Sequence, residues 1–144
     1  MKKERMKIFT KEADYAVRAL LYLAQKTEQG EVDYISVTAL AEEMGLPLHF
    51  LRRICSMLIK AELLDNKEGV NGGVRLIRYP HTITLRKIVE LFQDKLEICE
   101  CTFRKEICPN RKTCVLRRRL LQVEEKLANE FETITIQSLL DDMK

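Results

Sequence analysis

Residues 36–60 read SVTALAEEMGLPLHFLRRICSMLIK, and this stretch determines the fold that the sequence predicts. Ser36 is a favourable N-cap for a short helix over 37–44, and Gly45 follows where a left-handed backbone costs glycine little. Pro47 fits the first turn of a second helix. The apolar side chains of that second helix share one face: Phe50, Leu51, Ile54, Leu58 and Ala61. A short helix, a turn with glycine and a second helix make a helix-turn-helix motif.

A β-hairpin is expected directly after this motif. Leu63-Leu64 and residues 74–78 flank a polar stretch that contains Gly69, Gly72 and Gly73. A hairpin in this position is the wing of a winged helix-turn-helix domain. Apolar residues at helical spacing predict further helices over about 11–26 and 85–95, and a last long helix from Val115.

The last long helix carries a seam with spacings of 4, 3, 4 and 4 residues, close to that of a coiled coil, at Leu116, Leu120, Val123, Leu127 and Phe131. Residues 133–140 fit neither helix nor strand clearly. The expected fold is mainly α with a small β-hairpin: a winged helix-turn-helix plus a long C-terminal dimerisation helix. The expected division is 1–95 as DNA-binding domain, 96–114 as cysteine-rich sensor loop, and 115–144 as dimerisation helix and tail.

Composition excludes several classes of protein. The chain has 144 residues and a net charge of +3. This small charge is a cancellation, because residues 46–80 carry +3, residues 99–119 carry +5 and residues 120–144 carry −4. The longest apolar run, 19–24, is far shorter than the about 20 residues of a membrane span. No signal-peptide pattern follows the basic N-terminus, so a cytoplasmic protein is expected.

The second helix of the motif presents polar side chains opposite its apolar face. These side chains are His49, Arg52, Arg53 and Ser56. Arginine can bond guanine edges in the major groove, and cations on the hairpin can reach phosphates. The hairpin cations are Lys67, Arg75 and Arg78. A single arginine of this kind is more often part of an ordinary solvated face, but the whole arrangement favours double-stranded DNA as the partner.

Four of the five cysteines fall on one short segment, as Cys99-x-Cys101-x6-Cys108-x5-Cys114. Close-spaced cysteines in a cytosolic chain indicate metal binding or redox chemistry more often than structural disulfides. Iron–sulfur and zinc sites are not separable by this spacing. A disulfide or free thiols are the plainer alternatives. The fifth cysteine, Cys55, is expected to be a small buried hydrophobic residue.

An enzyme is not expected, because the sequence has no dinucleotide fingerprint, phosphate loop or nucleophile paired with His and Asp. Instead, four stretches resemble the Rrf-two family of bacterial winged-helix regulators, which includes the IscR and NsrR types. They are Asp14-Tyr-Ala-Val-Arg-Ala-Leu, Leu40-Ala-Glu-Glu-Met-Gly-Leu, Phe50-Leu with Leu58, and Gly72-Gly-Val-Arg-Leu. The likeness spans nearly the whole chain.

The resemblance implies a homodimer that binds promoter DNA and pairs through its long C-terminal helix. It implies a [2Fe-2S] or [4Fe-4S] cluster on Cys101, Cys108 and Cys114, sensing redox state, iron or nitric oxide. Asp14 matches a carboxylate ligand of the nitric-oxide sensors, and Glu12 is a second candidate. Cys99 is additional, and would replace Cys101 or serve as the fourth ligand.

The resemblance leaves two matters open. Some family members have no cluster and respond through a thiol or a protein partner, so a regulator without a cluster, or with zinc, is the alternative. Both repressors and activators fit the pattern, and repressor is the expectation.

Pro47 stands where a hydroxyl residue is common in the family, which removes one expected phosphate contact.

Overall fold

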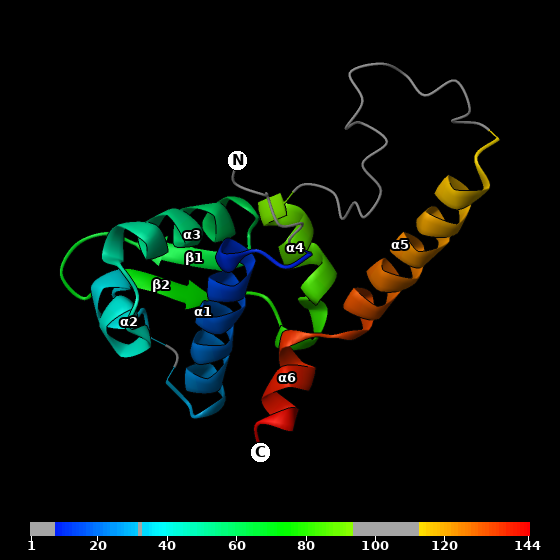
Figure 1. Ribbon diagram of the computed structural model, residues 1–144. Helices are drawn as coiled ribbons and strands as arrows, with labels where there is room; N and C mark the ends of the chain where they lie inside the picture. Colours follow the sequence, from blue (N-terminus) through cyan, green and yellow to red (C-terminus); the bar gives the residue numbers. More distant parts are fainter. Residues whose placement is uncertain (1–7, 32, 94–112) are drawn as a thin grey trace.

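The computed structural model describes residues 8–31, 33–93 and 113–144 (Figure 1). Within these ranges the chain is mainly helical with one two-stranded antiparallel sheet. The elements, in chain order, are α1 (Lys11–Glu28), α2 (Val37–Met44), α3 (Leu48–Lys60), β1 (Leu64–Lys67), β2 (Gly73–Leu76), the short 3-10 helix η1 (Pro80–Thr82), α4 (Leu85–Gln93), α5 (Val115–Thr133) and α6 (Ile136–Asp142). The predicted fold class is confirmed.

The helix-turn-helix forms where its local signals place it. Ser36 caps α2, its Oγ accepting a hydrogen bond from the Ala39 amide at 3.0 Å, and Gly45 ends α2 in the left-handed region at φ 65°. The prediction for Pro47 was wrong by one residue. Its ψ of 130° keeps it outside the helix, so Pro47 is the N-cap of α3 rather than part of the first turn.

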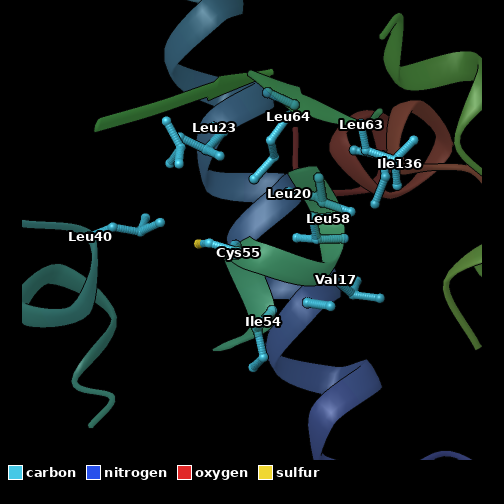
Figure 2. Packing of buried hydrophobic residues seen from close by; sticks show 14 of the residues in the cluster. Val17, Leu20, Leu23, Leu40, Ile54, Cys55, Leu58, Leu63, Leu64 and Ile136 are labelled. Carbon is cyan, nitrogen blue, oxygen red and sulfur yellow. The ribbon is translucent and has the colours of Figure 1, made fainter. Parts of the chain in front are cut away.

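The core lies between α1, α3 and the hairpin. One face of α1 is lined with small and large apolar residues, and it packs against the apolar face of α3 (Figure 2). Leu20 on α1 and Leu58 on α3 are fully buried, as are Leu63 and Leu64 where the chain enters the hairpin. Burial of each leucine side chain stabilises the fold by about 1.5–3 kcal/mol. This packing fixes α3 with its opposite face outward.

The wing is anchored on both edges of β2. One edge pairs with β1, in a register that sets Asp65 opposite Arg75. The other edge bonds Ile35, whose amide donates to Val74 O at 2.9 Å and whose carbonyl accepts from the Val74 amide at 2.8 Å. Gly73 allows this approach, because a Cβ there would lie 2.1 Å from the Ile35 carbonyl oxygen.

Residues 133–140, which the sequence left unassigned, end α5 and form most of α6. Ile136 and Leu140 are buried in the same core as α1 and α3. Backbone bonds hold this segment beside η1 and α4: the Ile136 amide donates to Ile83 O at 3.0 Å, and the Leu85 amide donates to Ile134 O at 2.7 Å. The end of the chain therefore packs into the winged domain, although the predicted division grouped it with the dimer helix.

At its amino end, helix α5 stands apart from the other helices and strands that the structure describes (Figure 1). Its carboxyl end packs through Leu127, Ala128 and Phe131 against Val89 of α4 and Ala13 of α1. None of its residues is buried, and Leu116 and Val123 are 66% and 51% exposed. The predicted seam is thus divided: its carboxyl part packs within the chain, while its amino part is open.

Candidate nucleic-acid interface

The face of α3 opposite the core carries the four polar residues that the sequence singled out. All four are exposed: His49, Arg52, Arg53 and Ser56. The residues on the opposite face of the helix, Leu51, Ile54 and Leu58, are buried. The helix therefore presents two arginines, an imidazole and a hydroxyl on one outward surface, which we call the α3 polar face.

The two arginines of the α3 polar face differ in their surroundings. Arg53 forms an ion pair with Glu12 of α1, with Nη2 and Oε1 3.3 Å apart. Arg52 has no ion-pair partner within residues 8–31, 33–93 and 113–144. A guanidinium without a carboxylate partner keeps its full set of donors for a base or a phosphate.

The hairpin adds two exposed cations, Lys67 on β1 and Arg75 on β2. Arg75 lies near Asp65, with Nη2 and Oδ2 3.8 Å apart, at the limit of an ion pair. This loose pairing leaves Arg75 able to contact another anion.

The third predicted wing cation, Arg78, has a structural contact. Its Nε donates to the Glu62 carbonyl at 3.0 Å and its Nη2 to Glu62 Oε2 at 3.2 Å. Glu62 sits in the left-handed region at φ 59°, where a residue with a Cβ is strained. Arg78 therefore braces the corner between α3 and β1, a use that the sequence did not predict.

Of the predicted cluster ligands, Cys99, Cys101 and Cys108 lie outside the described residues. Cys114 is the N-cap of α5, and its Sγ accepts a hydrogen bond from the Arg117 amide at 3.4 Å. Asp14 pairs with Arg18 one turn along α1, at 3.1 Å between Oδ2 and Nε. The part of the chain that the structure describes brings no three His, Cys, Asp or Glu side chains together as a metal site.

Cys55 is a buried core residue, as predicted. It is 2% exposed and packs within the main cluster, with its sulfur directed toward Leu40 (Figure 2). Burial raises the pKa of its thiol from 9.0 to about 11. The thiolate is the reactive form of cysteine, so Cys55 is chemically quiet at neutral pH.

Two acids contact predicted DNA-binding cations, and neither contact was expected from the sequence. Glu12, expected only as a candidate cluster ligand, pairs with Arg53, and Asp65 approaches Arg75. The charge pattern could have shown that acids were available. Only the packing of α1 on α3 and the register of the hairpin show which acid meets which arginine.

Comparison with known proteins shows which family combines a winged helix-turn-helix with a long C-terminal helix in this way. The model of the Rrf2 (Rrf-two) family, described as iron-dependent transcriptional regulator, matches residues 9–142. The chain belongs to the Rrf2 family. The Rrf2 proteins are DNA-binding transcription regulators, which confirms the expectation that this chain is not an enzyme. No helix in the described ranges is long and apolar enough to cross a membrane.

Similar Rrf2 proteins include the HTH-type transcriptional regulator NsrR of Shouchella clausii. It is 29% identical over 139 residues, which cover 94% of this chain and 91% of the relative. Among solved structures, T. potens IscR matches with a TM-score of 0.74 at 22% identity, over 96% of this chain and 89% of the other. CymR, the global cysteine regulator of B. subtilis, matches with a TM-score of 0.72 at 20% identity, over 95% and 98%. These structures share the fold.

Proposed function

We propose that this Rrf2 regulator binds operator DNA as a homodimer and represses transcription, under the control of an iron–sulfur cluster on its cysteine segment. The observation that carries the proposal is the α3 polar face beside the cationic wing. A helix of this kind lies in the major groove, and two copies read half-sites about one helical turn, roughly 34–36 Å, apart. Arg52 then contacts base edges, while Lys67 and Arg75 contact phosphates.

The open part of α5 supports the homodimer. Leu116 and Val123, one heptad apart on the predicted seam, are both exposed in its amino half. Exposed apolar side chains that follow a helical seam favour a second helix of the same kind. A second copy of α5 would cover them and set the spacing of the two α3 helices.

The residues on the cysteine segment fit a thiolate-bound cluster in their chemistry. Cys114 offers its sulfur at the amino end of α5, where Sγ already accepts a hydrogen bond from the Arg117 amide at 3.4 Å. Cys101 and Cys108 would complete the trio, with Asp14, Glu12 or Cys99 as the fourth ligand. A bound cluster supplies a centre that oxidants, iron depletion or nitric oxide can alter. The chain's contribution is to connect that centre directly to α5.

Thiol sensing without a cluster is the second candidate. The likeness in fold to CymR, the global cysteine regulator of B. subtilis, favours it. In that case the cysteines of residues 99–114 would respond by forming a disulfide or by binding zinc, and no visible absorption would accompany the response.

Anaerobic purification tests the cluster. Iron, sulfide and zinc are measured with the visible spectrum, for the wild-type protein and for Cys108→Ala. We expect a coloured wild-type protein with iron and acid-labile sulfide. We expect a colourless variant whose DNA binding does not change when an oxidant is added. A colourless wild-type protein that contains zinc, or neither metal, would overturn the cluster and favour the second candidate.

Arg52→Gln tests the DNA contact, against Arg86→Gln on α4 as a matched control. The wild-type protein first selects a duplex of about 30 base pairs from a random pool, so that two half-sites fit. We expect Arg52→Gln to weaken binding by about 1–3 kcal/mol, in proportion to a lost bidentate base contact. Arg86 pairs with Glu90 away from α3, so its loss should change little. Equal binding by both variants would contradict the assignment.

A further inference from the structure

The ring of Tyr34 lies close to both wing cations that the proposed function assigns to DNA. Arg75 Cζ is 4.7 Å and Lys67 Nζ 5.9 Å from the centroid of its ring. Its hydroxyl donates a hydrogen bond of 2.6 Å to Asp65 Oδ2. One aromatic ring in the segment before α2 thus contacts a wing anion and two wing cations.

The backbone pairing of the wing produces this arrangement. Ile35 pairs with Val74 on the free edge of β2, and successive side chains of an extended chain point to opposite faces. Val74 is buried, so Tyr34 and Arg75 project to the outer face. The hairpin register then sets Asp65 on the far side of Arg75. The phenol hydroxyl of Tyr34 reaches past Arg75 to the Asp65 carboxylate.

Both oxygens of the Asp65 carboxylate therefore have donors closer than the guanidinium of Arg75. Oδ2 accepts from Tyr34 at 2.6 Å, and Oδ1 accepts from the Asn66 amide at 2.9 Å. Arg75 Nη2 remains 3.8 Å away, and its side chain is 45% exposed. The hydrogen bond to Asp65 also raises the pKa of Tyr34, so the phenol keeps its proton and remains a donor.

We propose that Tyr34 is a positioning residue for DNA binding. Its hydroxyl donates a hydrogen bond to the Asp65 carboxylate, and its ring positions Arg75 and Lys67 to contact phosphates. A cation held over a ring keeps its N–H donors for other acceptors. Without the hydroxyl, Asp65 Oδ2 loses its closest donor and takes Arg75 as a full ion-pair partner. The inference rests on the proposed function, because it specifies how the wing of that interface is made ready.

The test is Tyr34→Phe, measured on the duplex of about 30 base pairs that the wild-type protein selects from a random pool. The variant keeps the ring and loses the hydroxyl. We expect its affinity to fall roughly threefold to tenfold, and the plot of log affinity against log salt to become shallower by about 0.9 for one lost phosphate contact. In Tyr34→Phe/Asp65→Asn the competing carboxylate is gone, so affinity and salt slope should return to wild-type values.

Tyr22→Phe is the matched control, because Lys26 lies 5.6 Å from the Tyr22 ring on α1, away from the wing. It should bind as the wild-type protein does. Wild-type affinity and slope in Tyr34→Phe would overturn the inference. So would a loss of affinity with an unchanged slope and no rescue by Asp65→Asn, since that pattern marks a purely structural role. A wild-type protein that enriches no duplex would overturn the proposed function itself, and the inference with it.

Discussion

Arg53 Nη2 lies 3.3 Å from Glu12 Oε1, so an ion pair joins the first turn of α1 to the α3 polar face. Glu12 is the more enclosed partner, with 29% of its side chain exposed against 66% for Arg53. If α3 binds DNA as proposed, the carboxylate competes with DNA phosphate for the same guanidinium. It is also one of the acids that the family resemblance offers as a cluster ligand. The state of Glu12 therefore bears on both parts of the proposed function.

Glu12→Gln should strengthen DNA binding. The substitution removes a negative charge beside Arg53 and leaves the guanidinium with no carboxylate to satisfy, so affinity should rise roughly twofold to fivefold. The stability of the fold should change by less than about 1 kcal/mol, because exposed ion pairs contribute little. Fluorescence anisotropy over a range of salt concentrations measures the effect.

Glu31→Gln is the control for Glu12→Gln, because it makes the same change of charge at the Lys26 ion pair, beyond the carboxyl end of α1. An equal gain of affinity in both variants would assign the effect to net charge and not to the Glu12–Arg53 pair.

Leu116→Glu should convert the proposed dimer to a monomer. The substitution buries a carboxylate in the proposed seam between two α5 helices, where it has no partner. Met143→Glu, at the end of α6, is the control, because Met143 is similarly exposed at 61% against 66%. Light scattering after gel filtration gives the mass of each variant. Dimers of unchanged stability in Leu116→Glu would place the contact between copies elsewhere.

Cys55→Ala should leave sensing intact and alter the response of stability to alkaline pH. Because the folded pKa of the Cys55 thiol is raised from 9.0 to about 11, the native state holds a proton that the unfolded chain releases. The stability of the wild-type protein should therefore fall as the pH rises from about 9 to about 11. The variant should lack this component of the fall, and should lose about 1 kcal/mol at neutral pH from the small cavity.

The measurement for Cys55→Ala is urea unfolding at several pH values. Parallel pH profiles for the wild-type protein and the variant would show that Cys55 ionises normally. A variant that no longer responds to the oxidant would contradict the assignment of Cys55 to the core alone.

Gly73→Ala should detach the wing from the segment before α2. Its Cβ would meet the Ile35 carbonyl oxygen at 2.1 Å, and its φ of 149° already disfavours a side chain. Gly69→Ala at φ 93° has the same backbone penalty with no atom within 4 Å, so it isolates the clash. We expect Gly73→Ala to lose about 1–3 kcal/mol more than Gly69→Ala, with faster amide exchange at Val74. Equal losses would show that the bridge to Ile35 contributes nothing.

The helix-turn-helix was predictable because its signals are local. The Ser36 cap, the left-handed Gly45 and the apolar spacing of α3 each act within a few residues of the structure they produce. The outward face of α3 and the burial of Cys55 follow from the same spacing. Residues 133–140 carry one local signal, the capping box of Thr135 and Ser138 at the start of α6, but their apolar pattern did not assign them to a helix. Their helix is stabilised by packing of Ile136 and Leu140 in a core built from distant parts of the chain.

In the candidate site, too, some features follow from the sequence alone and others only from the tertiary structure. The sequence by itself determined which cations stand on α3 and the wing, and which cysteines lie together on one segment. Only the tertiary structure decided their partners: Glu12 meets Arg53, Glu62 holds Arg78, and Tyr34 occupies Asp65 beside Arg75. The reason is physical. Helical spacing and capping depend on neighbours in the chain, whereas an ion pair or hydrogen bond between distant residues depends on how whole elements pack.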